Sequence, residues 1–111
     1  MKSRKLSLVL VAVLILTVVL AGCSGGSKGT EVIKIGVIGP MTGDNSMYGT
    51  SVREGAMLAA KEINAAGGVD GKKVEIIAYD SKGDKTEAVN AYNRLRDQDG
   101  IVALVGATFS G

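Results

Sequence analysis

The sequence predicts an α/β domain built on a parallel sheet, because strand-like and helix-like segments alternate along residues 31–111. Three short apolar runs rich in β-branched residues are separated by two longer segments of helical periodicity, with glycines near most boundaries. This alternation is typical of consecutive βαβ units. We therefore expect a βαβαβ order after residue 30.

The three apolar runs predict the strands. Residues 32–38 (VIKIGVI) and 101–105 (IVALV) are nearly continuous apolar stretches, as in strands of a parallel sheet that are covered on both faces. Residues 73–79 (KVEIIAY) alternate only in part, and Glu75 indicates a more exposed strand.

Two helices are predicted between these strands. Ser51 and Glu54 have the spacing of a capping box and predict the start of the first helix, and Asp84 with Glu87 gives the same signal for the second. Apolar residues three or four positions apart predict the inward faces, namely Val52, Ala56, Ala59, Ile63 and Ala66 in the first helix and Ala88, Ala91, Tyr92 and Leu95 in the second.

Glycines predict the helix ends and the topology follows from the element order. Gly67-Gly68 suits a left-handed C-cap of the first helix, Gly100 is expected to stop the second, and residues 69–72 (VDGK) predict a turn. Right-handed crossovers predict the strand order 2-1-3. The loops at residues 39–49 and 106–111 then meet at the carboxyl edge of the sheet, where such sheets bind ligands. Because three strands leave both sheet edges open, we expect the sequence to be part of a larger lobe.

Residues 1–22 are typical of a secretory signal peptide. Lys2, Arg4 and Lys5 precede an apolar run at residues 6–20, which is shorter than the about 20 residues that span a membrane. Residues 23–30 predict a flexible tether, since they are rich in Gly and Ser.

The end of this signal resembles the lipobox of bacterial lipoproteins in Leu20-Ala21-Gly22-Cys23. The resemblance implies that Cys23 is acylated and becomes the mature N-terminus, anchored to the extracytoplasmic face of a bacterial membrane. Cys23 is the only cysteine in the sequence, so it has no internal disulfide partner there. An incidental thiol beside an ordinary cleavage site is the alternative.

Charge and composition argue against several functional classes. All 11 acidic residues but only ten of the 13 basic residues follow Cys23, so the positive net charge belongs to the signal. We therefore expect no nucleic-acid partner. The sequence contains no histidine, which removes the commonest general base, and we expect no catalytic activity, metal or cofactor.

Several segments, taken together, resemble the leucine/isoleucine/valine-binding type of substrate-binding protein of ABC transporters. They are residues 35–43 (IGVIGPMTG), 48–49 (YG), 62–71 (EINAAGGVDG) and 79–80 (YD). The resemblance covers residues 33–111. It implies the type I periplasmic-binding-protein fold, in which two α/β lobes close over one ligand, and it places residues 31–111 in the N-terminal part of the first lobe.

The same resemblance implies capture of an amino acid, with a branched-chain side chain favoured, and its delivery to an ABC transporter permease. It places Ser110 at the ligand carboxylate, with Thr108 as a second donor and Tyr48 as an aromatic wall. Each has a simpler interpretation: Ser110 as a helix cap, Thr108 as a turn residue, and Tyr48 as packing on Met41 or Met47. A disulfide of some relatives is absent, because its positions hold Gly83 and Phe109.

Three other functions remain as alternatives. The two-lobed module also serves as the ligand-sensing domain of receptors. A dinucleotide-binding domain fits less well, because Gly36, Gly39 and Gly43 do not form the G-x-G-x-x-G pattern. An enzyme with Asp44 or Asp80 as its base lacks a nucleophile or metal cluster, and Asp80 is better explained as a strand-end turn residue.

Overall fold

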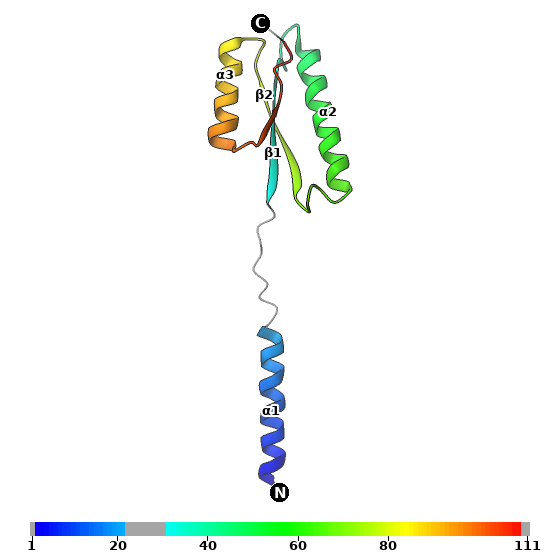
Figure 1. Cartoon of the computed structure of the whole chain (residues 1–111), viewed down its shortest axis with the longest axis vertical. Coiled ribbons are helices and arrows are strands. Elements are labelled where there is room, and N and C mark those ends of the chain that lie inside the picture. Colours follow the sequence, from blue (N-terminus) through cyan, green and yellow to red (C-terminus); the bar gives the residue numbers. More distant parts are fainter. Residues whose placement is uncertain (1, 22–30, 110–111) are drawn as a thin grey trace.

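The computed structural model describes residues 2–21 and 31–109 of the chain. The first range forms α1 (Lys2–Ala21), within the segment predicted to be a signal peptide, and Figure 1 shows this helix apart from the sheet. In the described part of the chain, no helix has both the length and the apolarity needed to cross a membrane. Cys23 and the rest of the predicted tether up to residue 30 lie outside the described residues.

Residues 31–109 contain a parallel sheet of three strands, β1 (Val32–Gly39), β2 (Lys73–Asp80) and β3 (Ala103–Val105). The spatial order is β2-β1-β3. β1 pairs with β2 along its whole length, so that Gly39 lies opposite Asp80, and β1 also pairs in parallel with β3. The predicted α/β class, strand order and first two strands are therefore confirmed.

β3 is shorter than the predicted strand at residues 101–105. Gly100 has a left-handed backbone with φ of 70°, and the Ile101 amide still donates to the Leu95 carbonyl of the preceding helical turn at 3.1 Å. Regular pairing begins only at Ala103. The predicted start was wrong because Ile101 still belongs to the turn that ends the helix, whereas the Val102 amide makes the first bond to β1, to the Lys34 carbonyl at 2.9 Å.

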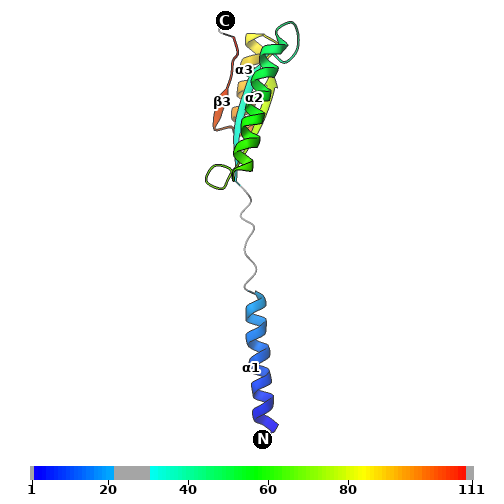
Figure 2. The ribbon, with the colours of Figure 1, turned by 90° about the vertical axis from the view of Figure 1, so that its right-hand side faces the viewer.

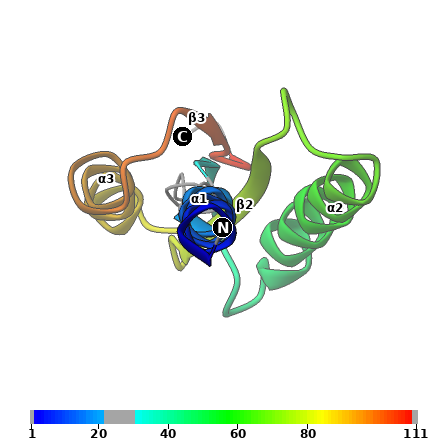
Figure 3. The same cartoon turned by 90° about the horizontal axis from the view of Figure 1, so that it is seen from below.

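The helices α2 (Ser46–Ala65) and α3 (Lys85–Arg94) cover opposite faces of the sheet, as Figures 1 and 3 show. The crossover from β1 to β2 and the crossover from β2 to β3 run in opposite directions across the sheet. Two right-handed crossovers of opposite direction place their helices on opposite faces.

The core lies between the sheet and these two helices. Ile38, Ala91 and Leu95 form a buried cluster, with Ile77, Tyr79, Ala88 and Ile101 packed against it. Gly36 makes room for this packing, because a Cβ there would lie 2.8 Å from Leu95 Cδ1. Val37 is fully buried and, since strand side chains alternate, it points to the opposite face under α2.

α2 begins at Ser46, so the predicted start at Ser51 was wrong. Its N-cap is Asn45, without a side-chain cap. Ser51 Oγ instead donates to the Met47 carbonyl at 2.6 Å inside the helix, and the Glu54 carboxylate pairs with Arg53 at 2.7 Å. The capping-box spacing arose by coincidence within the second turn.

The predicted inward stripe of α2 is correct in its first half and wrong in its second. Val52 and Ala56 are partly buried, whereas the later positions of the stripe, Ala59, Ile63 and Ala66, are exposed. Ala60 is buried in their place, followed by Asn64, whose side-chain amide exchanges hydrogen bonds of 2.8 and 2.7 Å with the backbone of Val74. The apolar pattern could not predict this position, because Asn64 is polar although it lies on the inward face.

The predicted end of α2 is confirmed. The Gly68 amide donates to the Ile63 carbonyl at 2.8 Å and the Gly67 amide donates to the Asn64 carbonyl at 3.2 Å, which is a Schellman motif. The predicted turn follows, with φ of 51° at Asp70 and 76° at Gly71, values that suit a type I′ turn.

α3 starts at its predicted cap, because Asp84 Oδ1 accepts a 2.9 Å hydrogen bond from the Glu87 amide. One wider turn, η1 (Leu95–Asp99), completes the helix before Gly100. Ala88, Ala91 and Leu95 face the core as predicted. Tyr92 does not, because it is 41% exposed and lies under the Arg96 guanidinium.

Candidate functional site

The loops that follow the three strands gather at one edge of the sheet. They are residues 40–45 after β1, 81–84 after β2 and 106–109 after β3. Parallel strands all point their carboxyl ends the same way, and β1 lies between the other two at the switch point of the sheet. Figure 2 shows this edge at the opposite end of the sheet from the turn at residues 66–72. The predicted meeting of the first and third loops is confirmed.

Two glycines allow these segments to approach closely. A Cβ on Gly49, in the first turn of α2, would collide with the carbonyl of Pro40. A Cβ on Gly39 would lie 2.8 Å from Thr108 Oγ1 and 3.0 Å from the Gly49 Cα. The end of β1 and the start of α2 therefore meet with almost no space between their backbones, and the Thr108 side chain packs directly against the end of β1.

Asp80, the last residue of β2, connects two of the loops. Its Oδ1 accepts hydrogen bonds of 2.7 Å from the Met41 amide and 2.7 Å from the Lys82 amide. Its Oδ2 accepts a 2.5 Å hydrogen bond from the Thr42 hydroxyl. Asp80 was predicted only as a turn residue, and the 39 positions that separate it from Met41 left no sequence signal for this contact.

These hydrogen bonds set the ionisation of Asp80. Partial burial alone would raise the pKa of this carboxyl, but the donors from Met41, Thr42 and Lys82 stabilise the charged form and together hold the pKa below its ordinary value. Asp80 is therefore a carboxylate throughout the neutral pH range.

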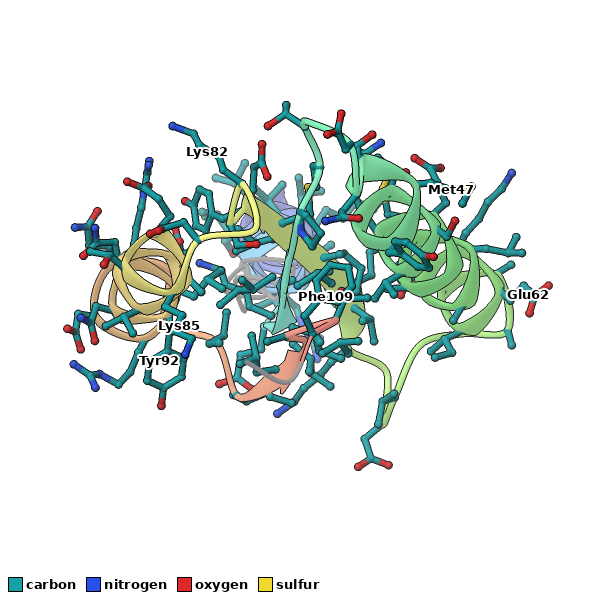
Figure 4. The ribbon with its side chains drawn as sticks, turned by 90° about the horizontal axis from the view of Figure 1, so that it is seen from above. Met47, Glu62, Lys82, Lys85, Tyr92 and Phe109 are labelled. Carbon is teal, nitrogen blue, oxygen red and sulfur yellow. The ribbon has the colours of Figure 1, made fainter. Side chains whose placement is uncertain are left out.

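Tyr48 and Phe109 form an aromatic pair between the first turn of α2 and the loop after β3. Their ring centroids are 5.5 Å apart in an edge-to-face arrangement with an interplanar angle of 74°, which is a favourable geometry. Tyr48 is 50% exposed and Phe109 is 45% exposed. Figure 4 looks onto this edge of the sheet and places Phe109 between α2 and α3. Tyr48 therefore contacts the loop after β3.

Thr108 turns its hydroxyl inward. Its Oγ1 is buried beside Gly39 and, among the described residues, has no hydrogen-bond partner. A buried hydroxyl without a partner costs roughly 1–3 kcal/mol. Thr108 and Phe109 also line an open cavity of about 400 Å³, whose other walls include Pro40, the loop after β2 and the start of α3 with Asp84 and Lys85.

The structure thus brings two of the predicted ligand-binding residues, Tyr48 and Thr108, to the same edge of the sheet. Tyr48 is not among the residues that line the cavity beside Thr108. Ser110 lies outside the described residues. Within residues 2–21 and 31–109, no cluster of three or more His, Cys, Asp or Glu side chains could hold a metal ion.

Comparisons with known proteins identify similar chains. A family model described as periplasmic binding protein matches residues 32–111. The amino acid binding protein of Pseudomonas aeruginosa is 45% identical over 74 residues, which cover 67% of this chain and 20% of the relative. The leucine-, isoleucine-, valine-, threonine- and alanine-binding protein of the same organism is 39% identical over 87 residues, which cover 78% of this chain and 23% of the relative.

A solved structure is similar as well. It is the branched-chain amino acid transporter substrate-binding protein LivJ from Streptococcus pneumoniae in complex with isoleucine, with 42% identity and a TM-score of 0.66 over 69% of this chain and 22% of the relative. The chain spans about a fifth of the length of the curated relatives it matches.

Proposed function

The chain belongs to the periplasmic binding protein family, and from this membership we propose that the protein is an extracytoplasmic solute-binding lipoprotein for a branched-chain amino acid. It captures the amino acid outside the cytoplasmic membrane and delivers it to the permease of an ABC transporter. The loops at the carboxyl edge of the sheet contribute one wall of the ligand site.

The convergence of the loops after β1 and β3 at the switch point carries this proposal. It gathers the aromatic side chains of Tyr48 and Phe109 at this edge, next to a cavity that Thr108 and Phe109 line, at the place where sheets of this kind bind small molecules. The likeness to a substrate-binding protein crystallised with isoleucine supports an amino acid as the ligand.

The ligand carboxylate is assigned to the loop after β3. Backbone amides at the end of a strand and the hydroxyl of Ser110 would donate to it, and hydrogen bonds to a charged group contribute roughly 1.5–3 kcal/mol each. Thr108 is the second donor. Among the described residues its hydroxyl has no hydrogen-bond partner, and it would turn from its buried place beside Gly39 toward the cavity that Thr108 lines in order to reach the ligand. Tyr48 contributes the aromatic wall.

Calorimetric titration of the full-length protein against the common amino acids tests this function. We expect saturable binding of leucine, isoleucine or valine and weaker binding of charged amino acids. Ser110→Ala should weaken binding at least about tenfold, since it removes one hydrogen bond to a charged group. Ser51→Ala, which changes the same residue type inside α2, should bind as the wild type does. Binding of none of the amino acids would contradict the proposal.

The lipid anchor is a separate part of the proposal. Acylation of Cys23 would hold the protein at the membrane, because each buried methylene of an acyl chain contributes about 0.8 kcal/mol and more than one chain gives stable anchoring. In cells given labelled palmitate, we expect the wild type to be labelled and to sediment with membranes, and Cys23→Ala to lose both properties. An unlabelled wild type that is released in soluble form would contradict the anchor and leave the ligand assignment intact.

A further inference from the structure

Asp80 is the residue through which the loop after β1 is tied to the neighbouring strand. Within residues 40–45, the remaining backbone hydrogen bonds in the described part of the chain are local, from the Ser46 amide to Gly43 and from the Tyr48 amide to Asn45. The bonds from Met41 and Thr42 both end on the Asp80 carboxylate. Without this carboxylate, the loop would keep its internal turn and the bond from the Ser81 amide to the Gly39 carbonyl just before it, but residues 41 and 42 would lose their hydrogen bonds to β2.

The carboxylate is itself held in a fixed orientation. Its Oδ1 accepts from the Lys82 amide two residues further on, which is the local bond of an Asx-turn. A carboxylate has about four lone-pair sites, so the same group still has capacity for the donors from Met41 and Thr42. The bond within its own turn thus helps to orient the Asp80 carboxylate toward the first loop.

The loop leads directly into the part of α2 that faces the candidate site. Tyr48 lies in the first turn of α2 and its ring contacts Phe109. Gly49 packs against Pro40, which precedes the residues held by Asp80. A displacement of residues 41–42 would therefore shift the start of α2 and the aromatic ring that it carries.

We propose that Asp80 is a positioning residue for ligand binding, which fixes residues 40–45 and with them the place of Tyr48 opposite the loop after β3. This inference rests on the proposed function, because it assigns Asp80 a role in the same ligand site. Asp80 acts through the loop and does not touch the ligand.

Two variants separate positioning from charge. Asp80→Ala removes the acceptors for all three donors. Asp80→Asn keeps an oxygen for the amides of Met41 and Lys82, and its amide nitrogen can donate to the Thr42 oxygen in place of the original bond. Asp97→Ala is the matched control, since Asp97 is also a hydrogen-bonded aspartate but pairs with the exposed Arg96.

The experiment measures two properties of the full-length protein under conditions in which every variant is folded. Hydrogen exchange of the amides at residues 40–46 reports on the loop, and titration with L-isoleucine reports on the site. We expect Asp80→Ala to accelerate hydrogen exchange in this segment and to weaken isoleucine binding by about tenfold. A tenfold loss corresponds to a loop that has the binding-competent conformation in only about a tenth of the molecules. Asp80→Asn should regain most of the affinity, and Asp97→Ala should change neither property.

Thr42→Val keeps the test decisive if Asp80→Ala does not fold. This variant removes one of the donors to Asp80 and should accelerate hydrogen exchange in the loop. We expect it to weaken isoleucine binding about threefold, because more molecules keep the ordered loop than in Asp80→Ala. Wild-type affinity in a folded Asp80→Ala, or in Thr42→Val when only that variant folds, would overturn the inference.

The two proposals fail in distinguishable ways. Equal weakening by Asp80→Ala and Asp80→Asn with an unchanged loop would indicate a direct effect of charge on the ligand, which also overturns the positioning role. A wild type that binds none of the common amino acids would overturn the proposed function, and the inference with it. In that case, the exchange of residues 40–46 would still decide whether Asp80 holds the loop.

Discussion

Asp80 accepts more hydrogen bonds than any other carboxylate in the described part of the chain, and this environment makes its charge part of the fold. The donors come from Met41, Thr42 and Lys82. They favour the ionised form and lower the pKa of Asp80 despite its partial burial. The contribution of this carboxylate to stability must therefore depend on pH.

The sign of that dependence follows from the direction of the shift. A carboxyl group whose folded-state pKa is lowered stabilises the fold fully above its unfolded value of about 3.9 and loses that contribution as the pH falls through the folded pKa. We expect the stability difference between the wild type and Asp80→Asn, measured by denaturant unfolding, to be constant near neutral pH and to shrink below about pH 4.

Because the stability of Asp80→Asn is subtracted from that of the wild type, the difference reports on Asp80 and not on the two other acids whose pKa values are lowered. Hydrogen bonds from Lys72 lower the pKa of Glu31, and hydrogen bonds from Arg96 lower the pKa of Asp97. Both pairs are unchanged in Asp80→Asn, so their titration cancels. A difference that stays constant down to pH 3, well below the ordinary carboxyl pKa of about 3.9, would show that the Asp80 charge does not support the loop.

The first turn of α2 shows how a residue of low helix propensity can be required. Gly49 is buried, and a Cβ at this position would collide with the backbone of Pro40. We expect Gly49→Ala to lower the free energy of unfolding by about 1–3 kcal/mol or more, because helix and loop must separate. Denaturant unfolding measures the change.

Gly55 provides the matched control in the same helix. A Cβ at Gly55 would meet nothing within 4 Å. Gly55→Ala should therefore raise the free energy of unfolding by roughly 0.5–1 kcal/mol, the advantage of alanine over glycine in a helix interior. Equal effects of the two substitutions would contradict the close contact at Gly49.

The two helix starts differ in how their caps work, and a pair of alanine substitutions can distinguish them. Asp84 caps α3 through the Glu87 amide, so Asp84→Ala should cost about 1 kcal/mol. Ser51 lies inside α2 and donates to the Met47 carbonyl. Ser51→Ala should be neutral or slightly stabilising, since alanine has the higher helix propensity. A comparable loss of stability in both variants would indicate that Ser51 caps a helix after all.

Sequence patterns predicted the elements whose signals are local. The cap at Asp84, the Schellman end at Gly67-Gly68 and the turn at residues 69–72 each depend on residues within a few positions of one another. The predicted start of α2 was wrong because Ser51 bonds to Met47 inside the helix, and the actual N-cap, Asn45, makes no side-chain cap bond that would mark the start. The inward place of Asn64 was missed because it bonds to a strand that the pattern of α2 does not contain.

The topology of the sheet could be predicted because few arrangements satisfy right-handed crossovers and side-by-side strands. That rule gave the order β2-β1-β3 and the meeting of the loops after β1 and β3. It placed Tyr48 and Thr108 at one edge without knowledge of their contacts. It could not give the Tyr48–Phe109 pair or the role of Asp80, because these depend on side-chain directions between loops distant in sequence.

The central claim is that the carboxyl edge of the sheet contributes one wall of an amino-acid site. Backbone amide NMR shifts of the full-length protein, recorded during titration with L-isoleucine, test it most directly. In this part of the sequence, we expect the largest changes at residues 40–48 and 106–111, with little change at the opposite edge, residues 66–72 and 99–102. Saturable changes confined to that opposite edge would contradict the claim.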